Sequence, residues 1–306
     1  MKRARTTTQF VDEGPNEVLP GQRFGLEVEL PAILDQHSSF QHLQIFQSVS
    51  YGKILVLDGV VQLTERDEFA YHEMIAHVPI VSLLGKQLTQ LKVLLVGAGD
   101  GGALREILKH PEVVKITHIE IDQLVVDACR QHLPNISNGA FADPRVNLVI
   151  CDGLEYLRQS AGKDQGEYDL CIVDSGDPSE GPNGALYQAE FYSLVKRWLN
   201  PKHGLLCFQS EHVWLHHELI VTLKQRCDTI FPLVRYYSTQ VPSYPGGQIG
   251  FLLCALDDQC RFKQVLVHLS PTLELKYYTP QVHSASFALP KWFQTALLPQ
   301  DGKRKE

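Results

Sequence analysis

The 306-residue chain lacks the patterns that mark disulfide-bonded, zinc-binding or membrane-spanning proteins. It has seven cysteines, an odd number, and none forms a CxxC pair, which argues against a zinc site and a disulfide framework. No stretch approaches the roughly 18 apolar residues that a membrane-spanning helix needs. The polar N-terminus, residues 1–8, lacks the apolar segment of a signal peptide. We therefore expect a cytoplasmic protein with no metal and no membrane partner.

Clustered basic charge is also scarce. The formal net charge is -7, and the one dense run of Lys and Arg is the short tail at residues 303–305. Because binding to phosphates requires a clustered basic face, nucleic acid is not expected as a partner. A mildly acidic protein is better suited to a cationic ligand.

Two hydrophobic patterns divide the chain. Between residues 24 and 62, short alternating runs predict an antiparallel sheet of hairpins, and residues 65–84 predict a helix with Thr64 as its N-cap. From Leu91, apolar strands alternate with helices, which predicts a mostly parallel sheet covered by helices on both faces. The expected strands span residues 92–96, 116–120, 146–150, 169–173, 205–208 and 249–255.

These patterns predict a Rossmann-like α/β fold of the class I methyltransferase type, with a small N-terminal antiparallel β domain. The expected domains are residues 1–85, comprising the β domain and its linking helix, and residues 86–306, the catalytic domain.

A glycine-rich loop joins the first strand of the second pattern to its helix. Residues 97–102 read Gly-Ala-Gly-Asp-Gly-Gly, which formally matches the GxGxxG loop of dinucleotide-binding folds. Asp100 argues against that interpretation, because a carboxylate there would repel a pyrophosphate and attract an ammonium or sulfonium group. A tight turn without any ligand remains the alternative.

Acidic residues follow three neighbouring strands. Glu120 ends the second strand about twenty residues beyond the loop, where a carboxylate accepts hydrogen bonds from ribose hydroxyls, and Asp152-Gly153 follows the third. Together with Gly97 and Gly99 they predict an adenosine site across the carboxyl ends of the strands. Asp174 and Asp177 follow another strand, and the glycine-rich stretch behind them suggests a mobile lid. A simple Asp-Pro turn is the alternative for Asp177.

Several long segments resemble the spermidine synthase family, in consistent order from about residue 21 to 293. They include residues 57–62, 65–74, 97–106, 173–178, 209–211, 242–251, 276–278 and 283–290. The resemblance implies an aminopropyltransferase that moves a three-carbon amine from decarboxylated S-adenosylmethionine to putrescine, giving spermidine and 5'-methylthioadenosine. The nucleoside is a co-substrate, so no cofactor is expected. Family members form dimers or tetramers through the N-terminal β region, so a homodimer or homotetramer is expected.

The resemblance also implies roles for individual residues. Asp174 matches the catalytic aspartate, with Tyr71 and Tyr244 able to support proton transfer. The nucleoside-binding positions are Gln41, Gly97, Gly99, Glu120, Asp152, Gly153 and Pro182. The amine-binding positions are His72, Asp100, Asp177, Gln209 and Tyr244.

Two departures from the family pattern concern the substrate sites. Residues 177–182 carry one residue more than the family's usual lid, which affects the assignment of Pro182, and Ser210 replaces a glycine, which could crowd the amine site. Other functions remain open: transfer to cadaverine, agmatine or spermidine, an S-adenosylmethionine-dependent putrescine N-methyltransferase, a silent binding relative, and, on the glycine loop alone, a nicotinamide dehydrogenase.

Overall fold

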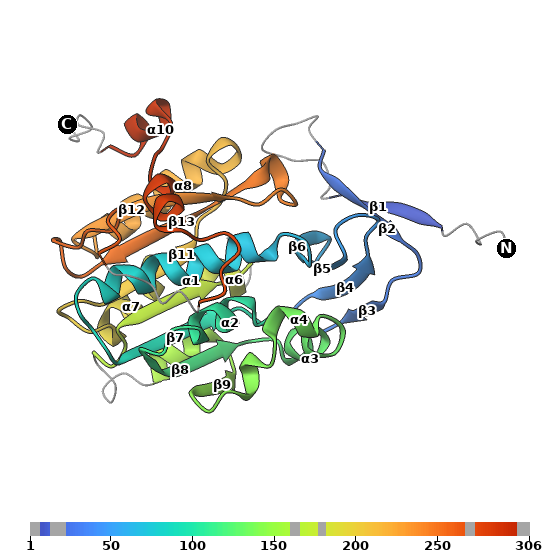
Figure 1. The fold of residues 1–306 in the computed structure, drawn as a ribbon, viewed down its shortest axis with the longest axis horizontal. Coiled ribbons are helices and arrows are strands. Elements are labelled where there is room, and N and C mark those ends of the chain that lie inside the picture. The colour runs from blue at the N-terminus through green and yellow to red at the C-terminus, as the bar shows by residue number, and fades with distance from the viewer. Residues whose placement is uncertain (1–6, 13–22, 160–165, 177–181, 267–272, 299–306) are drawn as a thin grey trace.

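The computed structural model describes residues 7–12, 23–159, 166–176, 182–266 and 273–298, and these form three sheets (Figure 1). The largest sheet has the order β12-β13-β11-β10-β7-β8-β9. Its strands are β7 (Leu91–Gly97), β8 (Val113–Glu120), β9 (Val146–Ile150), β10 (Leu170–Asp174), β11 (Leu205–Gln209), β12 (Leu233–Gln240) and β13 (Gln248–Ala255). Strands β7 to β11 pair in parallel, whereas β13 pairs antiparallel with both β11 and β12.

Helices follow or precede most strands of this sheet. They are α1 (Glu68–Leu84), α2 (Gly102–Leu108), α3 (Gln123–His132), α4 (Pro134–Ser137), α5 (Gly153–Gln159), α6 (Pro182–Ala185), α7 (Ala189–Trp198), α8 (Val213–Asp228), α9 (Pro280–Ser286) and α10 (Lys291–Ala296). None of the described helices is long and apolar enough to cross a bilayer.

Alternate residues of the central strands face opposite layers of helices. In β10, Ile172 lies in one hydrophobic cluster with the apolar residues of α1, whereas Cys171 and Val173 lie in another with residues of α7 and α8. This alternation follows from the period of two along a strand. The continuous apolar sequence of β10 is thereby explained, because both of its faces are covered.

The N-terminal residues form two antiparallel sheets. One pairs β1 (Thr8–Asp12) with β2 (Gly25–Glu29), and the other has the order β3 (Leu34–His37), β4 (His42–Gln47), β5 (Lys53–Leu57), β6 (Val60–Thr64). Leu43, Ile45 and Leu55 of the four-stranded sheet share a core cluster with Val125 and Cys129 of α3. This contact places the N-terminal strands beside the carboxyl ends of β7 and β8.

The fold class expected from the sequence is confirmed, with differences in detail. All six expected strands of the large sheet are present, but β12 was missed. Strand β13 runs antiparallel to its two neighbours, β11 and β12. The prediction of Thr64 as N-cap was wrong. Thr64 is the last residue of β6 and donates to Asp67 Oδ1 at 2.6 Å, and the helix begins only at Glu68. Asp67 is engaged by Ser243, whose backbone N–H and hydroxyl both donate to it.

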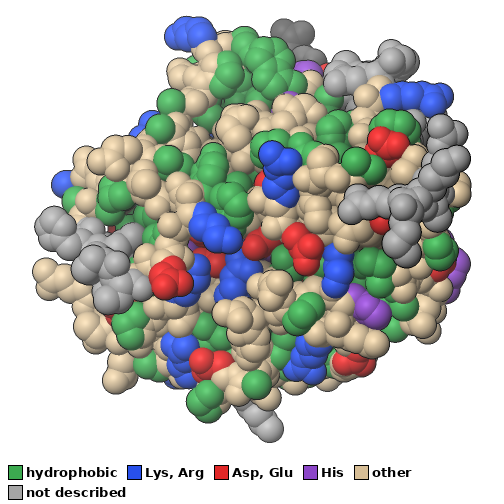
Figure 2. Space-filling view, turned by 45° about the vertical axis from the view of Figure 1, so that its right-hand side comes forward, with side chains coloured by type: hydrophobic (Ala, Val, Ile, Leu, Met, Phe, Trp, Pro, Cys, Tyr) green, Lys and Arg blue, Asp and Glu red, His purple; other side chains and the backbone are tan. Residues whose placement is uncertain are grey.

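The surface in Figure 2 has basic side chains interspersed with acidic ones. On this face the Lys and Arg side chains do not merge into one continuous basic area. Since phosphate binding depends on such an area, this face has no electrostatic footprint for nucleic acid.

Candidate active site

A pocket of about 910 Å³ opens at the carboxyl ends of β7, β8 and β10. Every predicted site residue whose side chain the structure describes lines this one pocket. These residues are Gln41, Tyr71, His72, Gly97, Gly99, Asp100, Glu120, Asp152, Gly153, Asp174, Gln209 and Tyr244. Parallel strands bring their carboxyl ends to one edge of a sheet, which explains why residues so far apart in the chain converge there.

The pocket lining is strongly acidic. Among the described residues that line it, six are carboxylates and none is Lys or Arg: Asp58, Asp100, Glu120, Asp152, Asp174 and Glu211. Such a lining attracts cations and repels phosphates. It therefore disfavours the dinucleotide interpretation of the glycine loop and favours a ligand that carries ammonium or sulfonium groups.

The glycine loop lies directly against the end of β10. Gly97 has a φ of 80°, and a side chain there would collide with the backbone of Asp174. The backbone N–H of Ala98 donates to the carbonyl oxygen of Asp174 at 2.7 Å, and His118 Nε2 donates to the carbonyl of Gly97 at 2.6 Å. Burial lowers the pKa of His118 to about 4, so its ring is neutral. These contacts fix the loop beside Asp174.

Glu120 lies at the end of the pocket assigned to the nucleoside. Its Oε1 accepts from the backbone N–H of Asp122 at 2.8 Å, and burial raises the pKa of Glu120 to about 7. A Cβ atom at Gly99 would come within 2.9 Å of Glu120 Oε2, so a larger residue there would displace the Glu120 carboxylate from its present position. Gln41, from the N-terminal sheet, donates to Asp122 Oδ2 at 2.9 Å. This hydrogen bond places the amide of Gln41 beside the end of β8.

Asp152 has a structural role in addition to the predicted one. Its Oδ1 accepts from the backbone N–H groups of Leu154 and Glu155, at 2.7 and 3.0 Å. These are free donors in the first turn of α5, so Asp152 caps that helix. Gly153 follows it as the first residue of α5 and lines the pocket floor.

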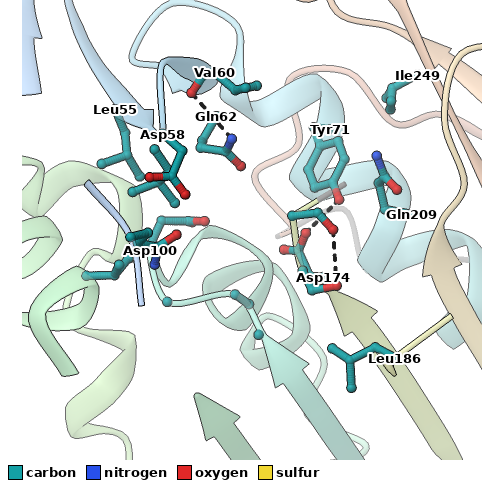
Figure 3. Close-up of a pocket in the computed structure, with 18 of the residues that line it drawn as sticks. Leu55, Asp58, Val60, Gln62, Tyr71, Asp100, Asp174, Leu186, Gln209 and Ile249 are labelled. Carbon is teal, nitrogen blue, oxygen red and sulfur yellow. Dashed lines mark hydrogen bonds between the residues drawn. The ribbon is translucent and has the colours of Figure 1, made fainter. Parts of the chain in front are cut away.

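Asp174 and Tyr71 meet in the middle of the pocket (Figure 3). Tyr71 on α1 donates its hydroxyl to Asp174 Oδ1 at 2.6 Å. Within the described part of the chain, the buried Oδ2 atom of Asp174 has no hydrogen-bond partner. The pKa of Asp174 is raised to about 6, mainly by burial and also by the negative charge of Asp100, whereas His72 and Tyr71 oppose the rise. Asp174 thus combines a proton affinity suited to a base with an oxygen available for a ligand.

His72 is buried between two carboxylates. Its Nδ1 lies 2.6 Å from Glu68 Oε2, and its Nε2 lies 3.3 Å from Asp100 Oδ1. His72, Asp100 and Asp174 each offer a polar atom within 4.8 Å of the other two. Both nitrogens of His72 already face carboxylates, so this arrangement fits a charged hydrogen-bonded network better than a set of metal ligands.

Tyr244 and Gln209, two of the residues assigned to the amine, line the pocket together with Tyr71. The Tyr244 ring centre lies 6.0 Å from that of Tyr71, and the Tyr244 hydroxyl donates to the backbone oxygen of Gln62 at 2.6 Å. Gln209 ends β11 and accepts from the hydroxyl of Tyr187 at 3.3 Å. Figure 3 shows Gln209 and Tyr71 on the same side of Asp174.

Two predicted positions are not tested by these contacts. Asp177 lies outside the described residues, and Pro182 is the first residue of α6 but its side chain is not described. Ser210 is buried, donates to the carbonyl of Phe208 at 3.1 Å and is not part of the pocket lining. The hydroxyl that this chain carries in place of glycine therefore points into the protein and does not crowd the pocket.

Several lining residues were missed as site residues from the sequence. They are Asp58, Gln62, Glu211, His212, His216 and Gln248. Asp58 and Glu211 have positive φ angles of 50° and 65°, which is uncommon for residues other than glycine. Asp-Gly is a common hairpin turn, but nothing in the spacing of Asp58-Gly59 indicates that this hairpin reaches the pocket.

Comparison with known proteins agrees with this geometry. Residues 68–264 match the family model described as the spermine/spermidine synthase domain, and residues 12–65 match the spermidine synthase tetramerisation domain. The chain is 44% identical to a spermidine synthase of Dictyostelium discoideum, over 90% of this chain and 93% of the relative. It is 45% identical to spermidine synthase 2 of Arabidopsis thaliana, over 89% and 80% of the two chains. It is 40% identical to the spermine synthase SPE4 of Saccharomyces cerevisiae, over 89% and 90%.

Two solved structures with the same fold are also spermidine synthases. One, in complex with the transition-state analogue AdoDATO, has a TM-score of 0.80 at 35% identity and covers 89% of this chain and 90% of its own. The enzyme from Thermotoga maritima has a TM-score of 0.81 at 32% identity, with 96% and 95% of the chains covered. The family models, the curated relatives and the solved structures therefore agree. The chain belongs to the spermine/spermidine synthase family of aminopropyltransferases.

Proposed function

We propose that this chain is a spermidine synthase that transfers the aminopropyl group of decarboxylated S-adenosylmethionine to putrescine. The observation that carries the proposal is the placement of Asp174 in the same acidic pocket as Asp100 and Glu120, with one carboxylate oxygen that has no hydrogen-bond partner among the described residues. Glu120 suits the ribose hydroxyls, Asp100 suits the ammonium of the aminopropyl group, and Asp174 suits the attacking amine.

The chemistry requires a base and does not require an oxyanion hole. A primary diamine titrates near pKa ~10, so its attacking nitrogen arrives protonated and must lose a proton. Asp174 Oδ2 takes that proton, and the free amine attacks the methylene carbon next to the sulfonium. A carbon–nitrogen bond forms as the carbon–sulfur bond breaks. The electron pair of the carbon–sulfur bond stays on sulfur, which leaves in neutral methylthioadenosine. Alignment of nitrogen, carbon and sulfur in the pocket supplies much of the acceleration.

The acceptor is the finer part of the proposal. Relatives named spermine synthase match this chain nearly as well as those named spermidine synthase, at 40% identity in yeast and 42% in Arabidopsis thaliana. Spermidine is therefore the second candidate acceptor. Putrescine is preferred because spermidine synthases predominate among the relatives and are the solved structures compared above.

Assembly and compartment belong to the same proposal. A homodimer or homotetramer through residues 12–65 is supported by the matched tetramerisation domain. The cytoplasm is supported by seven free cysteines, five of them buried.

Product analysis tests the reaction type. The protein is incubated with putrescine and either decarboxylated or intact S-adenosylmethionine, and products are identified by mass. We expect spermidine and methylthioadenosine in equal amounts from the decarboxylated nucleoside only. N-methylputrescine from the intact nucleoside would show that the chain is a methyltransferase.

We expect acid to inactivate the enzyme through Asp174 and Glu120. Asp174 can take a proton only when ionised, and Glu120 can accept from the ribose with both oxygens only when ionised, so activity is present above each pKa and is lost as pH falls through that value. The pKa values of about 7 for Glu120 and about 6 for Asp174 predict that kcat/KM for the nucleoside begins to fall near pH 7 and falls more steeply below pH 6. Initial rates between pH 5 and 9 measure this profile.

The variant Tyr71→Phe tests whether Asp174 causes the fall in kcat/KM below pH 6. The hydroxyl of Tyr71 lowers the pKa of Asp174 by donating to its carboxylate, so Tyr71→Phe moves that fall to higher pH. The variant Glu120→Gln removes only the fall in kcat/KM near pH 7. An acid profile unchanged by either variant contradicts the assignment of these groups.

A further inference from the structure

Helix α1 begins with a buried carboxylate that the proposed reaction does not use. The side chain of Glu68 is 7% exposed and is not part of the pocket lining. Its Oε2 lies 2.6 Å from His72 Nδ1, one helical turn further on, and 2.9 Å from Arg105 Nη2 of α2. Glu68 therefore joins α1 to α2 directly behind His72.

The contacts of His72 fit the protonated ring. A neutral imidazole donates from one nitrogen only, whereas an imidazolium donates from both. Here Nδ1 faces Glu68 and Nε2 faces Asp100, and neither carboxylate can donate when ionised. Burial alone would lower the pKa of His72, but Asp100 and Glu68 together raise it to about 10.

A positive charge on His72 stabilises the ionised forms of Asp100 and Asp174. Oxygens of Asp100 and Asp174 lie within 4.8 Å of each other and of the His72 ring. Two like charges that close favour protonation of one of them. His72 lowers the pKa of both Asp100 and Asp174 against the effect of burial, so both are better able to meet a cationic substrate as carboxylates.

The charged and titratable groups around His72 come from α1, from the glycine loop after β7, from the end of β10 and from α2. Glu68 and Tyr71 lie on α1, and Asp100 and Asp174 lie at the ends of β7 and β10. Arg105, on α2, is held in turn by Glu106 at 2.7 Å and by the carbonyl of Ile136 at 2.5 Å. The backbone of Gly102 also closes on the ring, because a Cβ atom there would overlap His72.

We infer that Glu68 is a positioning residue: backed by Arg105, it holds His72 as a fixed imidazolium that keeps Asp100 and Asp174 ionised for the cationic substrates. The inference deepens the proposed function and rests on it for the nature of those substrates. The protonation of His72 itself is a property of the free protein.

NMR titration of the histidine ring in the free protein tests the inference first. His72→Gln identifies the His72 signal, which we expect to remain that of an imidazolium from pH 6 to above pH 8. In Glu68→Gln the midpoint falls by about 1 to 3 pH units, the usual effect of losing one adjacent opposite charge. A wild-type midpoint below pH 7.5 overturns the inference even if the variant does not fold.

Glu73→Gln is the matched control. Glu73 is a buried carboxylate on the same helix, outside the pocket lining, and accepts backbone N–H groups of Lys276, Tyr277 and Tyr278 at 2.7–2.9 Å. The variant Glu73→Gln is expected to lower thermal stability without changing the titration midpoint of His72. An equal shift in the two variants would mean that Glu68 acts only through the stability of α1.

The pH dependence of turnover gives a second readout. His72→Gln removes the ring charge at every pH, so the pKa of Asp174 rises and the acid limb of kcat moves to higher pH. In Glu73→Gln the acid limb stays in place. An unmoved acid limb in His72→Gln overturns the link between the His72 charge and Asp174. If instead the protein transfers no aminopropyl group at all, the proposed function fails, while the NMR result still decides the state of His72.

Discussion

Asp174→Asn is expected to lower turnover by about 10²- to 10⁴-fold, the usual contribution of a positioned general base. Asparagine keeps the shape of the side chain and its contact with Tyr71 but cannot accept the proton of the attacking amine. Binding of methylthioadenosine should change little, because Glu120 is untouched and the glycine loop is bonded to the backbone carbonyl of Asp174, which the substitution leaves in place. Steady-state kinetics and calorimetry with methylthioadenosine measure the two effects separately.

Asp169→Asn is the control for this variant. Asp169 lies just before the other end of the same strand, where it accepts from the backbone N–H of Lys92 at 2.8 Å and lies 2.6 Å from His203 Nε2. It should affect stability and leave turnover nearly unchanged. If Asp174→Asn instead abolishes nucleoside binding while enzyme saturated with nucleoside still turns over normally, Asp174 is not the base.

Asp100→Asn is expected to reduce kcat/KM for the decarboxylated nucleoside by about 10- to 160-fold. This is the loss of one hydrogen bond between charged groups, about 1.5–3 kcal/mol. The intact nucleoside carries an additional carboxylate, which Asp100 repels, so the same variant should bind it more tightly as an inhibitor. Because Asp100 also faces His72 Nε2, the variant removes one of the two carboxylates that hold the ring.

The control for Asp100 removes the same charge elsewhere. Asp127 is exposed on α3, where Gln123 donates to it at 2.9 Å, and it lies outside the pocket. Asp127→Asn should leave unchanged the kcat/KM of the decarboxylated nucleoside and the inhibition constant of the intact one. If Asp100→Asn also leaves the kcat/KM of the decarboxylated nucleoside and the inhibition constant of the intact one unchanged, Asp100 does not select the donor.

The sequence could predict features that depend on local order along the chain. Asp100, Glu120 and Asp174 each follow a buried strand, and because parallel strands end at one edge of a sheet, their meeting in one pocket follows from the pattern. Strand β12 was missed because its sequence, with Arg235 at its centre, lacks the continuous apolar run of the buried strands. As an edge strand it is covered less completely.

Contacts that depend on tertiary packing could not be predicted in this way. Gln41 was assigned through family resemblance, and its place beside Asp122 depends on how the four-stranded sheet packs on α3. Glu68 was assigned no role from the sequence beyond its place in the segment of residues 65–74. Its pairing with Arg105, 37 residues away, requires two helices to lie side by side, which no spacing in the sequence encodes.

A competition among acceptors tests the central proposal most directly. Equal concentrations of putrescine, cadaverine, agmatine and spermidine are incubated with limiting decarboxylated S-adenosylmethionine, and the products are weighed at low conversion, before newly formed spermidine can compete. We predict spermidine from putrescine as the main product, formed in step with methylthioadenosine. Spermine as the main product would make the chain a spermine synthase, and methylthioadenosine release without any aminopropylated amine would contradict the proposed transfer.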